Sequence, residues 1–533
     1  MTQFLPIIYV RGFAGGTRGI DKAVDDPFYG FNEGSTHVRV GAHGNALFYQ
    51  FESPLLRLMM DYGYELKVRG DQQRLLNEAG SDSMPPRTIW VYRFYDPSAS
   101  TFDHPPLPYR IEDAARGLAD YIHKVLDKTK DADQVYLVAH SMGGLVCRSA
   151  IQRFMYTPNQ ALGPEEVAAG EGFAPDPAHQ EHVNLSGKVT PPFPVSKVVT
   201  YGTPHGGIDI DLGGSIGDWF VETFGPNGSD IFKEPRMRDY LSPEGQEDFH
   251  PPGGWDPRVP YFSALPAERY LSLVGTNPGD YDVALGWSSR AVGVKSDGLV
   301  QIRNAYVKGS NRAYIHRSHS GRYGLVNSEE GYQNLQRFLF GNLKIAISLS
   351  DLDLDLTDGA VWQADVGLAI RGVPVLMHYQ SATAHCPVVL SEENRDTPLN
   401  PVPLVTAFLL PKEDPAEPRR YALDLRVYCL REDRGFLSFG SHLEQVADWQ
   451  DALLVDVSTQ ADGTIGSARY QWNSTLAGAI AKAGTLDKEL MWRRAPDDTA
   501  ASPSFVARVD IPPVAESVLG PNAHLSVGIG HWE

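Results

Sequence analysis

The chain has 533 residues, of which 42% are hydrophobic and 21% are charged, so it can bury a core and is not a disordered protein. Its 66 acidic and 47 basic residues give a formal charge of −19, which argues against nucleic acid as the main partner. The three cysteines, Cys147, Cys386 and Cys429, cannot form a disulfide framework, and no Cys/His cluster indicates a structural metal.

The N-terminus carries no basic start followed by a long apolar stretch, so no signal peptide is expected. No apolar run approaches the roughly 18 residues that a membrane-spanning helix needs. We therefore expect a cytoplasmic location by default. Export by a route that reads no N-terminal signal stays open as the alternative.

Apolar strand patterns alternate with helical patterns along the first 341 residues. Residues 111–126 carry apolar side chains at helical spacing, and a last helix is predicted from Asn327, with Glu330 completing a capping box, to about Phe340. Gly341 is placed to end that helix. The alternation predicts a mostly parallel sheet of the α/β class. The strands are predicted at 5–10, 88–95, 134–139, 195–201, 270–275 and 312–315.

Two stretches interrupt this framework and are interpreted as insertions, at about 14–87 and 205–260. The second is rich in Gly and Pro and carries aromatic residues, among them Trp219, Phe220, Phe224, Phe232 and Phe249. Apolar side chains on an irregular segment indicate a lid or cap over an active site. The alternative is a packed loop with a small core of its own.

From residue 342 the pattern changes to runs in which apolar and polar residues alternate, separated by turn signals. This predicts a second domain, 342–533, with an all-β, sandwich-like fold after a catalytic domain at 1–341. Within it, Asp351, Asp353 and Asp355 could be taken for a calcium loop. The leucines between them favour a strand with one solvent-exposed face, so no metal site is predicted.

The segment 135–146 contains the most informative motif of the chain. An apolar run leads into His140-Ser141-Met142-Gly143, which is typical of the sharp strand-to-helix turn that carries a nucleophilic serine. The usual Gly-x-Ser-x-Gly pattern here begins with Ala139, a residue small enough for the turn. The sequence therefore predicts Ser141 as a nucleophile at a helix N-terminus, where the helix dipole favours developing negative charge.

A nucleophilic serine also needs two donors for the oxygen that becomes negative during acyl transfer. One is predicted to be the backbone N–H of Met142, directly after the serine. The other is predicted in the loop after the first strand, at 7–16, where Phe13 would supply its backbone N–H. Arg11 stands where bacterial lipases usually have a histidine, but a backbone donor tolerates that change.

The acid and the base are expected downstream, in the order Ser, Asp, His. Asp297, in the turn Ser-Asp-Gly-Leu-Val, is the predicted acid, with Asp280 and Asp282 as rivals. His319 is the predicted base because it precedes a Ser-Gly loop signal, whereas the alternative, His316, follows the last strand more closely.

A further string, Thr-Pro-His-Gly-Gly at 203–207, follows another predicted strand. Its His205 precedes the acid in the chain, so the order argues against His205 as the base. We expect this residue to shape the wall of the cleft or a turn.

The oxyanion loop, the serine turn, the acid turn and the histidine loop, in this order, resemble the lipase and esterase branch of the α/β-hydrolases. This branch includes lipid-anchor deacylases with similar serine and Thr-Pro-His-Gly-Gly strings. The resemblance covers about residues 5–340 and implies ester hydrolysis through an acyl-enzyme without a cofactor. A lipase or phospholipase is the expected activity. Small-ester esterase and acyltransferase activities are the alternatives, and a non-catalytic binding protein on a hydrolase scaffold is the rival from another class.

The expected partner is a lipid or another ester substrate. Peripheral membrane contact is a further expectation. The domain 342–533 resembles, in layout only, domains that seat lipases on membranes or bind a protein partner.

Overall fold

The computed structural model describes most residues of the chain. They are 4–12, 17–40, 45–67, 72–100, 110–155, 193–208, 229–251, 253–279, 295–321, 323–357, 360–391, 400–430, 447–460, 464–476, 484–495 and 504–533.

The density of internal contacts divides the chain into two compact units. The first, the α/β unit, comprises Gln3–Arg312 and His316–Tyr332. The second, the β unit, comprises Ala313–Ile315 and Gln333–Glu533. The division therefore falls inside the last helix before the all-β half, whereas the sequence predicts a boundary after residue 341.

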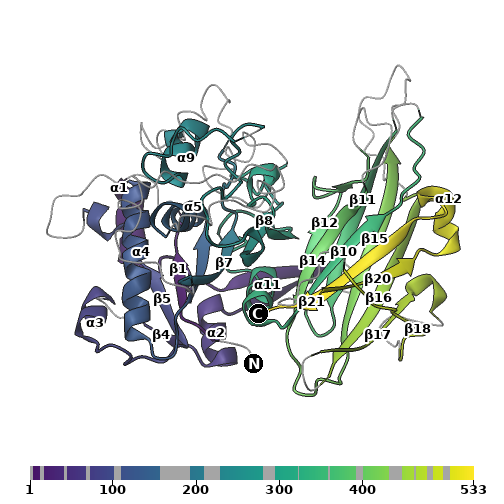
Figure 1. Cartoon of the computed structure of the whole chain (residues 1–533), viewed down its shortest axis with the longest axis horizontal. Helices are drawn as coiled ribbons and strands as arrows, with labels where there is room; N and C mark the ends of the chain where they lie inside the picture. Colours follow the sequence, from purple (N-terminus) through teal and green to yellow (C-terminus); the bar gives the residue numbers. More distant parts are fainter. Residues whose placement is uncertain are drawn as a thin grey trace. The chain divides into compact units, whose positions relative to one another are not determined.

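A seven-stranded sheet forms the centre of the α/β fold (Figure 1), with the strand order β4-β5-β1-β6-β7-β8-β9. The ladders from β4 to β8 are all parallel. The α/β-hydrolase type of core predicted from the sequence is thereby confirmed. The strands are β1 (Ile7–Val10), β4 (Glu65–Leu66), β5 (Thr88–Tyr92), β6 (Val135–His140), β7 (Val195–Tyr201), β8 (Tyr270–Gly275) and β9 (Asn311–Ile315).

Strands β1, β5 and β8 are buried along their whole length, which explains why they read as continuous apolar runs rather than as alternating ones. Helix α5 (Met142–Ser149) contacts β1 and β6, and helix α4 (Ile111–Lys128) contacts α5. The apolar stripe that predicted α4 is its buried face.

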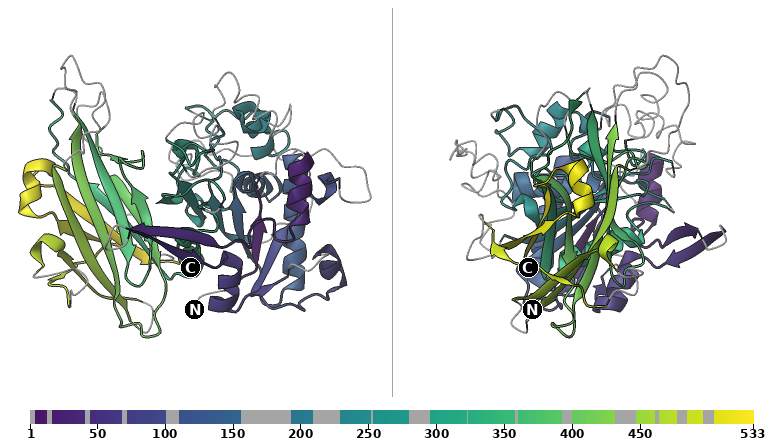
Figure 2. Two further views of the ribbon diagram at one scale, coloured as in Figure 1. Left: turned by 180° about the vertical axis from the view of Figure 1, so that it is seen from behind. Right: turned by 90° about the vertical axis from the view of Figure 1, so that its right-hand side faces the viewer.

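The stretch 14–87 contains more than an insertion. Its β4 pairs with β5 and extends the central sheet. The other elements lie outside the sheet, and the β2–β3 hairpin projects from its unit (Figure 2, right-hand view). They are α1 (Thr17–Asp25), β2 (Ser35–Val40), β3 (Ala46–Phe51), α2 (Pro54–Tyr62) and α3 (Gln72–Glu78).

The described part of 205–260 includes the short helix α9 (Glu234–Leu241). After it, Val259, Tyr261 and Phe262 form a small buried cluster against Phe249 and Trp255. These residues fit the alternative of a packed loop with its own core. Of the aromatic residues on which the lid interpretation rested, Phe232 is buried and Phe249 packs against this cluster, whereas Trp219, Phe220 and Phe224 lie outside the described residues.

The last helix, α11 (Glu329–Phe340), begins two residues later than the sequence predicts. Its cap is Ser328, whose Oγ accepts a hydrogen bond from Gly331 N at 2.9 Å. The predicted capping box is therefore wrong, because Glu330 pairs with Arg317 instead of with the backbone of Asn327. The helix ends at Phe340, as predicted from Gly341.

The β unit is an all-β fold of two antiparallel sheets, as predicted. One sheet has the order β14-β10-β21-β20-β19 and the other β12-β11-β15-β16-β17-β18. The strands are β10 (Leu343–Ser350), β11 (Val361–Ile370), β12 (Leu376–Gln380), β13 (Val388–Val389), β14 (Val402–Leu409), β15 (Arg419–Leu430), β16 (Trp449–Thr459), β17 (Ile465–Trp472), β18 (Lys488–Glu489), β19 (Arg493–Arg494), β20 (Ser504–Asp510) and β21 (His524–His531), with a short helix α12 (Glu516–Leu519).

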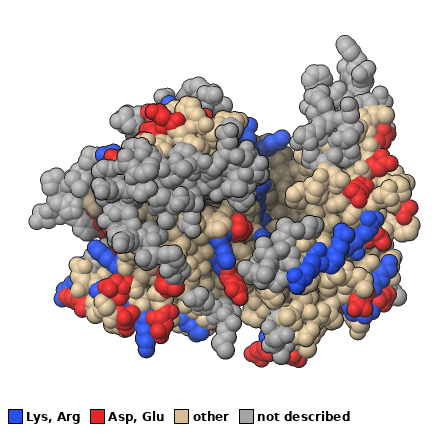
Figure 3. Space-filling model, in the orientation of Figure 1, with Lys and Arg blue, Asp and Glu red and all other residues tan. Residues whose placement is uncertain are grey.

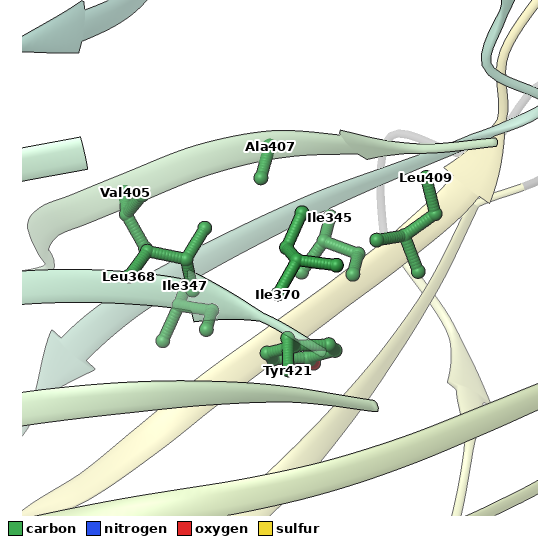
Figure 4. A pocket seen from close by; sticks show the side chains of 8 residues that line it. All are labelled: Ile345, Ile347, Leu368, Ile370, Val405, Ala407, Leu409 and Tyr421. Atoms are coloured by element: carbon green, nitrogen blue, oxygen red, sulfur yellow. The ribbon is translucent and has the colours of Figure 1, made fainter. Parts of the chain in front are cut away.

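The core of the β unit lies between its two sheets. Apolar side chains from both sheets line a narrow gap there (Figure 4), which has no room for a water molecule: Ile345, Ile347, Leu368, Ile370, Val405, Ala407, Leu409 and Tyr421. Such a gap is ordinary core packing.

The aspartate run does not form the strand that the intervening leucines favoured. Asp351 sits in a bend with a φ of 55°, and residues 352–356 have no regular secondary structure. Asp355 accepts hydrogen bonds from the backbone and hydroxyl of Thr357. Among the described residues, no group of three or more His, Cys, Asp or Glu side chains could hold a metal ion. None of the described helices is long and apolar enough to cross a membrane.

Candidate active site

Ser141 lies on a sharp turn between β6 and α5. Its backbone has φ 52° and ψ −131°, a conformation that costs a non-glycine residue about 1–3 kcal/mol. The backbone of the turn is held on both sides, because Ser141 N donates to Tyr201 O at 2.8 Å and Gly144 N donates to Ser141 O at 3.0 Å. The strained turn places the serine hydroxyl at the N-terminus of α5.

Small residues around the turn let neighbouring backbone approach it closely. A Cβ on Gly143 would collide with the carbonyl oxygens of Val10 and Arg11. A Cβ on Gly12 would lie 2.6 Å from Cβ of Ser141. The loop after β1 therefore runs against the serine, as the oxyanion-loop prediction requires, while Phe13 itself lies outside the described residues.

A chain of hydrogen bonds joins Ser141 to His319 and Asp297. His319 Nε2 lies 3.0 Å from Ser141 Oγ, and His319 Nδ1 lies 2.9 Å from Asp297 Oδ2. The two loops are also joined through the backbone, because His319 N donates to Asp297 O at 2.8 Å. All three side chains are buried, with exposures of 7%, 3% and 1% for Ser141, His319 and Asp297.

The second oxygen of Asp297 fixes the acid turn. Asp297 Oδ1 accepts hydrogen bonds from Leu299 N at 3.0 Å and Val300 N at 2.7 Å. Gly298 has a φ of 100°, which a side chain would strain, so glycine is needed at this position.

The other candidate residues lie elsewhere. His316 Nδ1 is 3.2 Å from Thr276 Oγ1, whereas the ring that lies against both Ser141 Oγ and Asp297 Oδ2 is that of His319. His205 is buried with its Nε2 3.0 Å from Thr200 Oγ1. Asp280 and Asp282 lie outside the described residues.

His140 is a member of the site that sequence reasoning missed. Its Nε2 lies 3.0 Å from the carbonyl oxygen of His319, to which it donates, and the two rings lie 4.9 Å apart between centroids. Burial, and then the neighbouring His319, hold the pKa of His140 well below its usual value, so the ring is neutral. The sequence signal that could have indicated this role is the position of His140 directly before Ser141.

Thr203 also contacts the nucleophile turn. Its Oγ1 donates to Ser141 O at 2.8 Å, and a Cβ on Gly144 would collide with its side chain. The Thr-Pro-His-Gly-Gly string therefore packs against the serine turn through its threonine rather than through His205.

Arg317, two residues before His319, was not predicted from the sequence. It is buried and pairs with Glu330 on α11, with the closest N–O distance at 3.0 Å. Its guanidinium also donates to Thr36 O at 3.1 Å and to His37 Nδ1 at 2.7 Å. These contacts fasten the histidine loop to α11 and to the base of the β2–β3 hairpin.

Comparison with known proteins adds one match in the region of the serine turn. Residues 109–174 match the family model described as "Putative serine esterase (DUF676)". This segment includes α4, β6, Ser141 and α5. No curated protein matches the chain significantly.

Solved structures also match along much of the chain. The product of the gene lin2722 from Listeria innocua is 14% identical, and the match covers 63% of this chain and 94% of that one, with a TM-score of 0.22. The "putative cell surface hydrolase from Lactobacillus plantarum WCFS1" is 12% identical, covering 64% and 93%, with a TM-score of 0.24. Scores this low do not bear on the fold or on the function of this chain.

Three observations agree with one another. The parallel sheet carries a strained serine turn, hydrogen bonds link the serine to a histidine and the histidine to an aspartate, and the serine-esterase match covers that turn. The non-catalytic alternative leaves this agreement unexplained. The protein is a serine hydrolase with an α/β-hydrolase fold, similar to the esterase and lipase branch.

Proposed function

We propose that the protein hydrolyses carboxylic esters of lipids through an acyl-enzyme formed on Ser141. The observation that carries this proposal is the buried hydrogen-bonded chain from Ser141 Oγ through His319 to Asp297. Such a chain lets a histidine take the proton of a serine while a carboxylate stabilises the charged ring.

In the first half of the reaction, His319 Nε2 takes the proton from Ser141 Oγ as this oxygen attacks the ester carbonyl. The carbonyl oxygen becomes negative and is held by the backbone N–H groups of Met142 and Phe13. His319 then gives the proton to the leaving alcohol, and the acyl group stays on Ser141.

In the second half, a water molecule gives a proton to His319 and attacks the acyl group. The serine leaves with the proton returned by His319, and the free acid departs. Asp297 stays ionised in both halves and keeps His319 in the tautomer that carries a proton on Nδ1.

The proposed lipid substrate is supported by the motifs rather than by a bound ligand. The serine turn and the Ser-Asp-Gly-Leu-Val acid turn resemble those of bacterial lipases. A water-soluble short ester, or an acceptor alcohol in place of water, would use the same catalytic groups. Substrate and acceptor therefore have to be separated by experiment.

The nucleophile is tested with a fluorophosphonate probe and the variant Ser141→Ala. We expect the wild-type protein to be labelled and Ser141→Ala to lose labelling and at least a thousandfold of its turnover of p-nitrophenyl butyrate. Ser517→Ala, which removes an exposed serine in the β unit, serves as the matched control and should keep both. Full activity of Ser141→Ala would end the proposal.

The substrate class is tested with p-nitrophenyl esters of increasing chain length, below and above the concentration at which they form micelles. A lipase should show a jump in rate when the interface forms. A small-ester esterase should show none and should prefer short chains. An added alcohol that diverts the acyl group from water to a new ester would identify an acyltransferase.

A further inference from the structure

Exposed apolar side chains gather on one short part of the α/β unit. Within the described residues, twelve large hydrophobic side chains are exposed, and eight of them lie between Val38 and Met60. Five belong to the β2–β3 hairpin: Val38, Val40, Leu47, Phe48 and Tyr49. We refer to these five as the apolar hairpin. Leu56, Met59 and Met60 follow on α2 at the spacing of one helix face.

Exposed apolar side chains lie on both faces of the hairpin. In the register of the ladder, Val38 pairs with Phe48, so these two side chains share one face. Leu47 and Tyr49 flank Phe48 in the strand and therefore point to the opposite face. Val40 is 81% exposed and Phe48 63%. A fluid apolar medium such as a lipid surface can cover both faces of a two-stranded ribbon at once.

The charge of this segment differs from that of the whole chain. The chain carries a net charge of −19, yet residues 34–51 contain no Asp or Glu and include Arg39. A carboxylate on an inserting segment would have to leave water and would be repelled by lipid phosphates. The hairpin therefore combines apolar and aromatic side chains with a charge that lets it approach a phospholipid surface.

The base of the hairpin is fastened to the active-site loop. Arg317 donates to Thr36 O and to His37 Nδ1, and it lies two residues before His319. The projecting ends of the strands, by contrast, are exposed. The hairpin is thus held at its base by the loop that carries His319, while the described parts of its strands expose apolar side chains. It is placed to hold the active site near a surface that these side chains enter.

We propose that the apolar hairpin is an interfacial anchor that inserts shallowly into a phospholipid surface. The inference rests on the proposed function only in that a lipid esterase would reach its substrate more easily when anchored to a lipid surface. Because the outer edges of a two-stranded ribbon keep unpaired backbone groups, insertion stops at the wet headgroup region. Lipid contact is thereby assigned to the catalytic unit rather than to the β unit.

The test measures co-sedimentation of the full-length protein with phosphatidylcholine vesicles made of ether-linked lipids, which an esterase cannot cleave. We expect the wild type to bind, and the double variant Val40→Glu/Phe48→Glu to bind about tenfold more weakly or not at all. The matched control is Met491→Glu/Val514→Glu, which puts two charges at exposed apolar positions of the β unit and should bind as the wild type does.

Turnover of soluble p-nitrophenyl butyrate separates this inference from the proposed function. The hairpin variant should keep that turnover while losing vesicle binding. Loss of turnover in Ser141→Ala bears only on the catalytic proposal, because Ser141→Ala should still bind vesicles. Equal vesicle binding by the wild type and the hairpin variant would overturn the anchor, as would absence of binding by the wild type.

Sedimentation velocity tests whether a second copy of the chain, rather than a lipid surface, covers the apolar hairpin. If the wild type dimerises and Val40→Glu/Phe48→Glu converts it to a monomer, the hairpin is a contact between subunits and the anchor proposal is wrong. A monomer in both cases, together with loss of vesicle binding in the variant, supports the anchor.

Discussion

The strained backbone of Ser141 depends on its immediate neighbours. Glycine is required at positions 12 and 143 because any Cβ there would collide with the serine or with carbonyls of the loop after β1. Ala139 is fully buried at the end of β6, where a small side chain fits. This explains how the turn departs from the usual Gly-x-Ser-x-Gly pattern and still forms.

Asp297→Asn tests the role of the acid. The amide oxygen can keep the hydrogen bonds from Leu299 N and Val300 N, so the loop should stay folded. An amide cannot stabilise a charged His319 and favours the wrong tautomer of its ring. We expect kcat for a soluble ester to fall about ten-thousandfold.

The control for Asp297→Asn is a thermal unfolding curve, which should shift little compared with the loss of activity. Fluorophosphonate labelling should slow in parallel with kcat, because both reactions need the activated serine. Wild-type kcat in Asp297→Asn would contradict the assignment of Asp297 as the acid.

At the scale of elements, two ion pairs on α11 allow a matched comparison. Arg317 pairs with Glu330 and also contacts the hairpin base, whereas Arg57 on α2 pairs with Glu329. The side chains of Arg57 and Arg317 are 18% and 8% exposed, and each pairs with a glutamate at the start of α11. Only Arg317 belongs to the loop that carries His319.

We expect Arg317→Lys to lower kcat about tenfold with little change in KM, because a lysine cannot hold Glu330 and the hairpin base together. Arg57→Lys should lower stability without changing kcat. Steady-state kinetics on a soluble ester, with urea unfolding of each variant, would separate the two effects. Equal kcat values in the two variants would show that the Arg317 contacts are only structural.

At the scale of the whole molecule, the negative charge is not gathered into one region on the face shown in Figure 3, where acidic and basic side chains lie among one another. We expect loss of stability in acid to come instead from histidines in both units whose pKa is lowered. Burial lowers the pKa of His140 and His205 in the α/β unit well below the usual value. In the β unit, burial lowers the pKa of His378 to about 4.

His378 gives a quantitative prediction for acid unfolding. Below about pH 6.5 the unfolded chain binds a proton at this residue, while the folded chain does not until about pH 4, so stability falls as the pH drops through this window. At pH 5 the loss is roughly 2 kcal/mol. Urea unfolding at pH 7 and pH 5 measures how much the free energy of unfolding falls between the two pH values. This fall should be larger in the full-length wild type than in His378→Gln by roughly the same amount. Equal losses would mean that His378 is not buried in its neutral form.

The sequence by itself determined the fold class, the serine turn and the chain order of the candidate acid and base. These features are local, because a buried parallel strand, a small-residue turn and a helix N-terminus each leave their pattern in consecutive residues. The all-β character of the second half was likewise readable from alternation. The strand expected at the aspartate run is absent.

Only the tertiary structure decided which side chains meet. His319 and Ser141 are 178 residues apart, and His316 is just as close in sequence, so the pairing depends on how the loop after β9 folds back. The contacts of Arg317 with Glu330 and the hairpin base join segments that no sequence pattern relates. Exposure of the apolar hairpin is equally a tertiary property, because an apolar strand has the same sequence pattern whether its side chains are covered or open to water.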